Sequence, residues 1–252
     1  MEYFIVGFPL KRPKSPEHWN NFFIKTGRKS RMQELELEPK NFLTFKEEIK
    51  KRKFKAIVVT MPYKKKLLNI CDTFDISAST TRSTNLIINQ YSNLIAYNTD
   101  VLGFELSLLK KNINMNGFDN FVIYGYGGTG EALAKYISKK FKKFIFVITS
   151  KNLKDTKYIK FFKKINKKLN NTLIINCTPI GSTLSKEKLY TSPFSKKFLD
   201  SFTNSFVYDI NYKISKKNDL KKICIKKNFK YMNGLYMNKI QAKEAIKITF
   251  PE

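Results

Sequence analysis

The stretch Gly125-Tyr126-Gly127-Gly128-Thr129-Gly130 decides the fold, because it has the spacing G-x-G-x-x-G. It follows an apolar run over 121–124 that predicts a buried strand, and it opens a predicted helix over 131–141. A second strand is predicted over 144–149. In this context the first glycine makes a tight turn, the second lets the backbone approach a pyrophosphate, and the third lets helix and strand pack closely. The sequence therefore predicts a dinucleotide bound at the helix N-terminus, with a plain glycine-rich turn as the alternative.

The turn after the second strand indicates which dinucleotide is bound. NAD sites place Asp or Glu there to hold the ribose 2′-hydroxyl, whereas Thr149-Ser150-Lys151-Asn152 contains no carboxylate. A carboxylate would repel a 2′-phosphate, and Lys151 would attract it. We therefore predict NADP as the cofactor. The alternative is an ordinary surface lysine in a chain that carries very many.

Strands and helices alternate along the rest of the chain. Helices are predicted over 17–26, 104–111 and 235–248, and strands over 3–8, 55–60, 87–89, 94–98, 172–176 and 206–210. Alternation of this kind indicates parallel sheet covered on both faces, so the fold class is α/β. We expect two domains with the active site in a cleft between them: residues 1–100, completed by a C-terminal helix within 234–252, and a Rossmann-like domain over 101–233.

The charge of the chain has two interpretations. Lys and Arg number 48 against 20 Asp and Glu, which gives a formal net charge of +28. Clustered cations would favour a polyanionic partner. However, the lysines are spread along the whole chain and arginine, which dominates base recognition, is scarce. We therefore expect no specific nucleic-acid partner.

Composition excludes several further classes of protein. The chain has 252 residues, of which 42% are hydrophobic, and this is enough for a large core or two modest ones. Its apolar runs are far shorter than a membrane span, and its N-terminus resembles a core strand rather than a signal peptide. Cys71, Cys177 and Cys224 form no CxxC pair, so we expect no disulfide, no metal site and a cytoplasmic location. The expected partners are small molecules, and the chain is expected to be a monomer or homodimer.

Polar residues gather at the ends of predicted strands in the first domain. Lys64 follows one strand, Asp100 follows another, and Asn85 precedes a third. A Lys beside an Asp can act as a proton-transfer pair, in which the ammonium hydrogen-bonds a substrate oxygen and the carboxylate holds the ammonium. The alternatives are a solvated lysine and a helix N-cap.

These motifs together resemble the shikimate dehydrogenase family over nearly the full length of the chain. The resemblance rests on segments that occur in the order typical of the family: Gly7-Phe8-Pro9 with Pro13-Lys14-Ser15-Pro16, Val58-Val59-Thr60-Met61-Pro62-Tyr63-Lys64, Asn98-Thr99-Asp100-Val101-Leu102-Gly103, Asn176-Cys177-Thr178-Pro179-Ile180-Gly181, Asp209-Ile210-Asn211-Tyr212 and Gly234-Leu235-Tyr236-Met237-Asn238-Lys239-Ile240-Gln241. Each segment is modest alone, and the glycine loop lies in its proper place among them.

The resemblance implies the reversible, NADPH-dependent reduction of 3-dehydroshikimate to shikimate, a step of aromatic amino acid biosynthesis. It implies that Lys64 and Asp100 are catalytic and that the last helix packs on the first domain. The substrate contacts that it implies are Ser15, Thr60, Asn85, Tyr212 and Gln241. The cofactor contacts are Gly125, Gly127, Gly128, Thr129, Gly130, Ser150, Lys151, Asn152 and Gly234.

Three residues depart from the family pattern. Pro13 stands where the family has a serine that binds the substrate carboxylate, Val58 replaces an asparagine, and Ser182 replaces a methionine. Pro13 and Val58 leave open a relative that uses quinate or an amino analogue. A second alternative is a non-catalytic protein that binds a nucleotide or another anion. His18, the single histidine, lies in the first predicted helix and is interpreted as a surface or packing residue.

Overall fold

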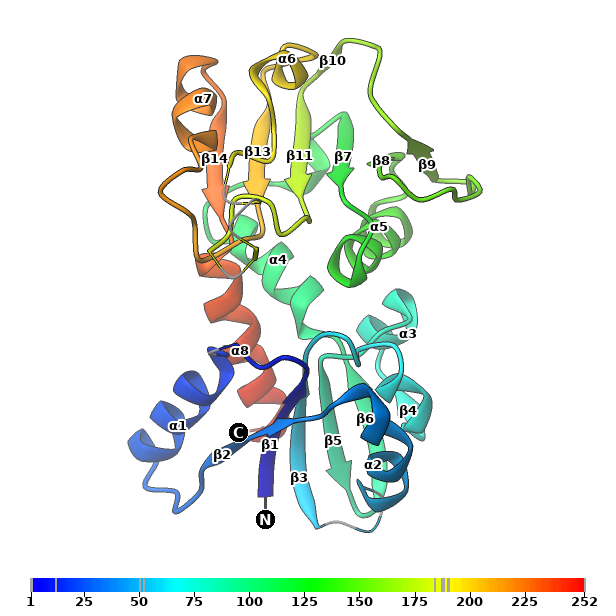
Figure 1. The fold of residues 1–252 in the computed structure, drawn as a ribbon, viewed down its shortest axis with the longest axis vertical. Coiled ribbons are helices and arrows are strands. Elements are labelled where there is room, and N and C mark those ends of the chain that lie inside the picture. The colour runs from blue at the N-terminus through cyan, green and yellow to red at the C-terminus, as the bar shows by residue number, and fades with distance from the viewer. Residues whose placement is uncertain are drawn as a thin grey trace. The chain divides into compact units, whose positions relative to one another are not determined.

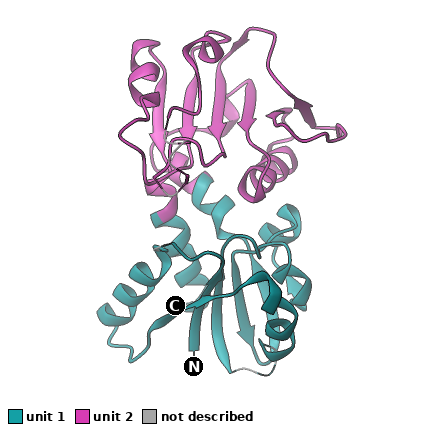
Figure 2. Ribbon diagram, in the orientation of Figure 1, with its two compact units in different colours: residues 1–104, 239–252 teal, residues 105–238 magenta. Residues whose placement is uncertain are grey.

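The computed structural model describes residues 2–11, 13–49, 51, 53–183, 185–186, 189 and 191–251. The chain divides into two compact units, which are drawn in different colours in Figure 2. Unit 1 comprises residues 1–104 and 239–252, and unit 2 comprises residues 105–238. Each unit has its own sheet, so the predicted α/β fold class is confirmed.

The sheet of unit 1 has six strands in the order β2-β1-β3-β5-β6-β4 (Figure 1). The strands are β1 (Glu2–Gly7), β2 (Met32–Glu36), β3 (Phe54–Val59), β4 (Thr73–Phe74), β5 (Leu86–Gln90) and β6 (Asn93–Tyr97). The helices between them are α1 (Ser15–Lys25), η1 (Pro39–Asn41), α2 (Phe42–Ile49), η2 (Leu67–Ile70) and α3 (Ile76–Thr81). The pairs β1–β2, β1–β3 and β4–β6 are parallel as predicted, whereas β5 runs antiparallel to β3 and β6, so the sheet of this unit is mixed. The cause is the hairpin β5–β6, whose short connection forces the two strands to run in opposite directions.

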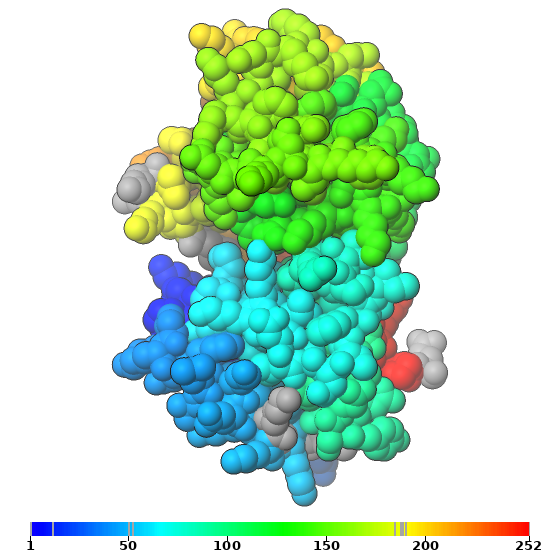
Figure 3. All heavy atoms as spheres, turned by 90° about the vertical axis from the view of Figure 1, so that its right-hand side faces the viewer, coloured from blue at the N-terminus to red at the C-terminus, as the bar shows by residue number. Residues whose placement is uncertain are grey.

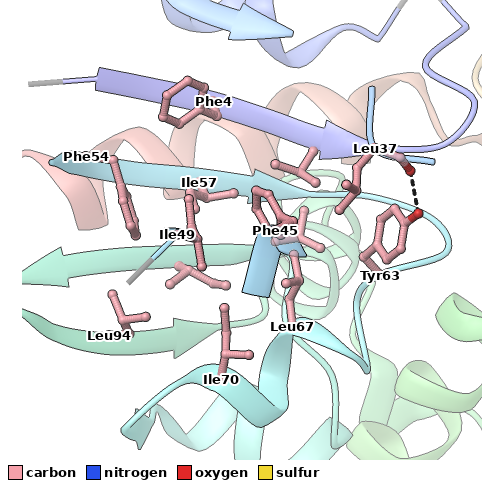
Figure 4. Packing of buried hydrophobic residues seen from close by; sticks show 13 residues of the cluster. Phe4, Leu37, Phe45, Ile49, Phe54, Ile57, Tyr63, Leu67, Ile70 and Leu94 are labelled. Atoms are coloured by element: carbon pink, nitrogen blue, oxygen red, sulfur yellow. Dashed lines mark hydrogen bonds between the residues drawn. The ribbon is translucent and has the colours of Figure 1, made fainter. Parts of the chain in front are cut away.

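Both faces of this sheet are buried, and side chains that alternate along each strand contribute to one face or the other. Phe4 and Ile57 pack with Phe45 and Ile49 of α2 on one face, as Figure 4 shows. Tyr3, Ile5, Ala56 and Val58 point to the other face and pack with Trp19 and Phe23 of α1 and Ala245 of α8 (Leu235–Thr249). The predicted packing of the last helix on the first domain is therefore confirmed.

Unit 2 contains a six-stranded sheet in the order β14-β13-β11-β7-β8-β9, with all pairs parallel. Its strands are β7 (Asn120–Tyr124), β8 (Ile145–Ile148), β9 (Ile159–Phe162), β11 (Thr172–Asn176), β13 (Phe206–Asp209) and β14 (Lys230–Asn233). With β7 counted as the first strand, this is the strand order of the Rossmann fold. The order reverses between β7 and β11, and ligands of such sheets bind at that point.

Helices and short strands complete unit 2. The helices are α4 (Thr99–Leu109), which begins in unit 1, η3 (Met115–Gly117), α5 (Gly128–Phe141), α6 (Lys196–Leu199) and α7 (Leu220–Lys226). β10 (Leu169–Asn170) and β12 (Phe202–Thr203) form a separate two-stranded sheet. Leu199 of α6 and Leu220 and Cys224 of α7 are buried against one face of the main sheet, next to Ile174 and Val207.

Candidate active site

One edge of the unit 1 sheet collects the polar residues of the first domain. Residues 60–64 follow β3, residues 98–100 follow β6, and Asn85 directly precedes β5. Because β5 runs antiparallel to its neighbours, its start lies at the same edge as the ends of β3 and β6. Backbone hydrogen bonds join these segments: Thr84 N–H donates to the Lys64 carbonyl over 2.9 Å.

Lys64 and Asp100 form an ion pair at this edge. The Lys64 Nζ to Asp100 Oδ2 distance is 2.5 Å, and the two side chains are 17% and 16% exposed. The Asp100 N–H donates to the side chain of Asn98, over 3.2 Å, at the start of α4. Asn98 therefore supplies the capping oxygen, Asp100 is left to face Lys64, and Lys64 is not a solvated surface lysine.

Asn85 connects this ion pair to the surrounding backbone and to α8. Its Nδ2 donates to Asp100 Oδ1 over 3.0 Å and to Thr99 Oγ1 over 2.9 Å, and its Oδ1 accepts the Thr99 N–H over 2.7 Å. Gln241 Oε1 lies 3.4 Å from Asn85 Nδ2 and accepts from Thr99 Oγ1 over 3.2 Å. Four predicted residues, Lys64, Asn85, Asp100 and Gln241, thus belong to one network. Thr99, which the sequence analysis did not single out, is its fifth member.

Two other predicted substrate contacts of unit 1 lie outside this hydrogen-bonded network. Ser15 is the first residue of α1, and no side chain caps that helix. Thr60 follows β3, and a Cβ added to Gly7 would lie 2.3 Å from the Thr60 methyl carbon, so glycine is needed there. Among the described residues, neither hydroxyl is hydrogen-bonded to Lys64, Asn85 or Asp100.

The glycine loop of unit 2 divides into glycines that the fold requires and glycines that it does not. Gly125 has φ +94°, and a Cβ on Gly130 would lie 2.1 Å from the Gly125 carbonyl oxygen. Gly127 and Gly128, in contrast, have nothing within 4 Å of such an added Cβ. α5 begins at Gly128, three residues earlier than predicted, so the N-terminus of the helix lies within the loop. Thr129 is in its first turn.

The segment after β8 lies at the surface of unit 2 on the face seen in Figure 3. A cavity of about 400 Å³ there is lined by Lys151, Asn152, Leu153, Lys154, Phe161, Phe162 and Lys163. Lys163 Nζ donates to the Ser150 carbonyl over 2.5 Å and to Asn152 Oδ1 over 2.9 Å. Lys151 Nζ donates to the Tyr126 carbonyl of the glycine loop over 2.9 Å. Sequence analysis missed Lys154 and Lys163, because single lysines carry little signal in this chain.

Asp209 organises the ends of β11 and β13. Its Oδ1 accepts from Asn176 Nδ2 and from Asn211 Nδ2, both over 2.9 Å. Asn211 Nδ2 also donates to the Ile180 carbonyl over 3.0 Å, which fixes the turn after β11. Burial raises the pKa of Asp209 to about 6 against the opposing hydrogen bonds. Two motifs that are far apart in the sequence thus form one buried polar cluster.

Tyr212 and Gly234 follow in the same unit. Tyr212 is partly buried just after this cluster. Gly234 is a packing requirement, because a Cβ there would lie 1.9 Å from the Ile210 carbonyl oxygen. Among the described residues no group of three or more His, Cys, Asp or Glu side chains could hold a metal ion, and no helix has the length and apolar character to cross a membrane.

The three departures from the family pattern lie in different surroundings. Val58 is a core residue of β3, packed with Tyr3 and Trp19, so this difference is a change within the core rather than at the polar edge. Pro13 is partly buried in the segment before α1. Ser182 is buried and forms an isolated bridge with Ile214.

Comparisons with known proteins show which family this chain resembles. The family model described as the shikimate dehydrogenase substrate binding domain matches residues 5–87. A shikimate dehydrogenase (NADP(+)) of Clostridium botulinum is 31% identical over 250 residues, which cover 96% of this chain and 93% of the relative. One from Caldicellulosiruptor bescii is 30% identical, over 98% of this chain and 88% of the relative.

Solved structures of similar fold also carry the shikimate dehydrogenase name. Shikimate dehydrogenase 1 from Peptoclostridium difficile has a TM-score of 0.81 at 25% identity and covers 99% of this chain and 92% of its own. A chorismate mutase/shikimate 5-dehydrogenase fusion protein from Clostridium acetobutylicum also has a TM-score of 0.81, at 26% identity, over 98% of this chain and 89% of that one. With the relatives matched over nearly its whole length, the chain belongs to the shikimate dehydrogenase family.

Proposed function

We propose that the chain catalyses the reversible, NADPH-dependent reduction of 3-dehydroshikimate to shikimate. Unit 1 is then the substrate-binding unit and unit 2 the NADP-binding unit. The observation that carries this proposal is the half-buried Lys64–Asp100 pair, which Asn85 joins to Thr99 and Gln241. Curated relatives at 30% and 31% identity are named as NADP-dependent shikimate dehydrogenases.

The residues of unit 1 transfer one proton and bind the substrate. NADPH, when bound, supplies the hydride. The Lys64 ammonium donates a hydrogen bond to the carbonyl oxygen of 3-dehydroshikimate and gives it a proton as the alcohol forms. Asp100 holds the ammonium in place. In the reverse direction the neutral amine takes the proton back.

The remaining polar groups of this edge orient the ring. Asn85 and Gln241 present amide groups beside the ion pair, and hydrogen bonds from Asn85 and from Thr99 to Gln241 Oε1 restrict these side chains. We propose Ser15 and Thr60 as further contacts, since their hydroxyls are not committed to the network described above. We propose Tyr212 of unit 2 as a contact of the ring.

Unit 2 fits NADP on two independent observations. The open space at Gly127 and Gly128, next to the N-terminus of α5, leaves room for a pyrophosphate against backbone N–H groups. Lys151, Lys154 and Lys163 surround one cavity with positive charge, which suits a ribose 2′-phosphate. The proposed contacts of the loop are Gly125, Thr129 and Gly130, those of the turn are Ser150 and Asn152, and Gly234 supports the site through packing.

The proposal is tested by following the reduced-nicotinamide absorbance with shikimate, quinate and aminoshikimate, each with NADP and with NAD. The expected result is highest kcat/KM for shikimate with NADP. Activity with none of the three substrates would contradict the proposal and would favour a non-catalytic binding protein. We further propose a cytoplasmic location and a monomer or homodimer, two states that sedimentation can distinguish.

Pro13 favours a second candidate, a relative that acts on quinate or an amino analogue. Proline offers neither a side-chain donor nor an N–H to the substrate carboxylate. The missing charge-assisted bond is worth about 1.5–3 kcal/mol, or roughly 10–150-fold in affinity. Lys14, whose Nζ pairs with Glu17 over 2.5 Å, is a possible substitute, as is Lys11; Arg12 lies outside the described residues.

Substitution of this loop separates the two candidates. If Pro13→Ser tightens shikimate binding several-fold, the carboxylate lies where the family holds it. If Pro13→Ser has no effect and Lys14→Ala or Arg12→Ala abolishes binding, a basic residue has taken over. If none of these variants changes shikimate binding, the shikimate assignment is wrong and another substrate must be sought.

A further inference from the structure

Unit 1 has a second cavity that the proposed reaction does not use. It has a volume of about 690 Å³ and lies between α1 and the C-terminal part of α8. It is lined by His18, Asn21, Phe22, Lys25, Thr26, Arg28, Lys239, Lys243, Ile246, Lys247, Phe250 and Pro251. Its volume is in the range of about 300–1,000 Å³ that is typical of small-molecule sites.

The floor of this cavity is apolar and aromatic. The rings of Phe22 and Phe250 lie 5.1 Å apart between centroids. Behind them Tyr3, Trp19 and Phe23 form a buried aromatic cluster that fixes Phe250 in place. A flat or ring-shaped apolar group would find a rigid surface here, because aromatic pairs keep defined orientations.

The rim of the cavity is strongly cationic. Lys239, Lys243 and Lys247 are spaced four residues apart on α8, so they share one face of the helix and repel one another. Lys25 and Arg28 come from the side of α1. None of the described residues that line the cavity is Asp or Glu.

Most of these charges have no compensating partner. Lys247 lies 3.4 Å from Glu244, and Arg28 lies over the Phe250 ring at 4.6 Å. In the described part of the chain, Lys25, Lys239 and Lys243 have no carboxylate within ion-pair distance. An anion at the rim would relieve the repulsion between the lysines, and the aromatic floor would bury the body of the ligand.

We propose that this cavity is a binding site for a small organic anion with an aromatic or aliphatic ring. Carboxylates, sulfonates and phosphates of this kind match both the rim and the floor. Apart from the lysines and Arg28, the polar side chains of the lining are few, namely Asn21, Thr26 and His18, so a polyhydroxylated ring would leave most of its hydroxyls without partners. The cavity therefore selects a different chemical class from the substrate of the proposed reaction.

The test uses 8-anilinonaphthalene-1-sulfonate as the aromatic anion, with the intact protein in saturating NADP. Binding is followed by calorimetry and fluorescence, with neutral N-phenyl-1-naphthylamine as the uncharged comparison. Binding of one sulfonate per chain is expected. The variant Lys239→Gln/Lys243→Gln should raise the Kd of the sulfonate about five- to tenfold. The matched control is Lys46→Gln/Lys53→Gln, which removes two exposed lysines elsewhere in unit 1 and should leave Kd unchanged.

A second variant, Asn21→Glu, places a carboxylate in the lining without removing a lysine and should weaken binding to a similar degree. Raising the salt concentration from about 50 mM to about 500 mM should raise the Kd of the sulfonate several-fold and leave the Kd of the neutral naphthylamine unchanged. The proposal is overturned if the two double lysine variants bind the sulfonate with the same Kd, or if the neutral compound binds as tightly as the sulfonate. It is also overturned if an acidic peptide binds at this cavity and the sulfonate does not.

Discussion

The two proposed sites use different parts of the chain: side chains in unit 1, and backbone groups with exposed lysines in unit 2. In unit 1 the side chains of Lys64, Asn85, Asp100 and Gln241 hold one another through hydrogen bonds, and all are at least partly buried. In unit 2 the loop offers backbone at Gly127 and Gly128 and exposed lysines around it. The first site is arranged before any ligand arrives, and the second supplies space, backbone donors and charge.

This difference follows from what each ligand needs. A carbonyl that must be reduced at one carbon requires a donor at one fixed position, so a side-chain network that restricts rotamers is useful. Phosphate groups can be met by N–H groups whose positions the helix already fixes. We therefore expect substitutions in unit 1 to lower turnover and stability together, and substitutions around the loop of unit 2 to act mainly on cofactor affinity.

The largest effect is expected for Lys64→Ala. Loss of the proton donor should lower kcat by about 10²–10⁴-fold. KM should change much less, and the fold should survive because Lys64 is not a core residue. Steady-state kinetics with shikimate and NADP measure this, with Lys65→Ala, one residue along, as the control. Near-normal turnover in the Lys64 variant would refute its catalytic role.

Asp209 tests whether unit 2 also contains a preformed polar cluster. Its pKa is raised from 3.8 to about 6 by burial, so the folded state binds the proton more tightly than the unfolded state. The stabilisation is therefore complete below pH 3.8 and is lost as the pH rises through about 6, by about 3 kcal/mol in all.

Urea denaturation between about pH 3.5 and pH 7 measures this contribution as the difference between wild type and Asp209→Asn. The wild type should lose stability relative to the variant as the pH rises, because the amide cannot ionise. A difference that stays constant over this range would show that Asp209 titrates normally and that the cluster does not desolvate it.

Asn85→Ala should show that the unit 1 network supports stability as well as turnover. Its removal leaves the buried Thr99 N–H without an acceptor, at a cost of about 2 kcal/mol in the free energy of unfolding. Urea denaturation measures this, and Asn41→Ala, an exposed residue, is the control. If Asn85→Ala and Asn41→Ala have the same free energy of unfolding, the hydrogen-bond network of unit 1 is not preformed. The proposed difference between the sites of unit 1 and unit 2 is then wrong.

The smallest effect is expected for Lys151→Ala, because this lysine is exposed and water screens its charge. KM for NADP should rise about 5–30-fold, from a contact of about 1–2 kcal/mol, while KM for NAD stays unchanged. Lys157→Ala, in the same segment but outside the cavity lining, is the control. A wild-type preference for NAD would contradict the interpretation of this turn.

Local spacing is what made part of this molecule predictable. The glycine loop and the strand-end positions of Lys64 and Asp100 are encoded within short stretches of chain. Gln241 lies 156 residues from its partner Asn85, so only the resemblance to a family could place it. Lys163 was missed because lysine is too common here to stand out.

Other features depend on packing that the pattern does not contain. The exposed strand β2 lacks the apolar alternation that would have revealed it. The alternative role of Asp100 as a helix N-cap does not hold, because Asn98, two residues earlier, accepts the Asp100 N–H. Neighbouring short polar residues compete for such positions, and tertiary contacts decide between them.

The split of unit 1 between the two ends of the chain sets the order in which this protein can mature on the ribosome. Residues 1–104 emerge before unit 2, but residues 239–252, which include Gln241, emerge only after it. At about 5–20 residues per second, the intervening unit takes roughly 7–30 s to synthesise. During that time the sheet face that later packs on Ala245 is covered by α1 but not yet by α8, and the Asn85 side chain lacks its hydrogen bond to Gln241. A chain truncated before α8 should therefore be prone to aggregation and inactive, so that catalytic activity requires α8 to have been synthesised.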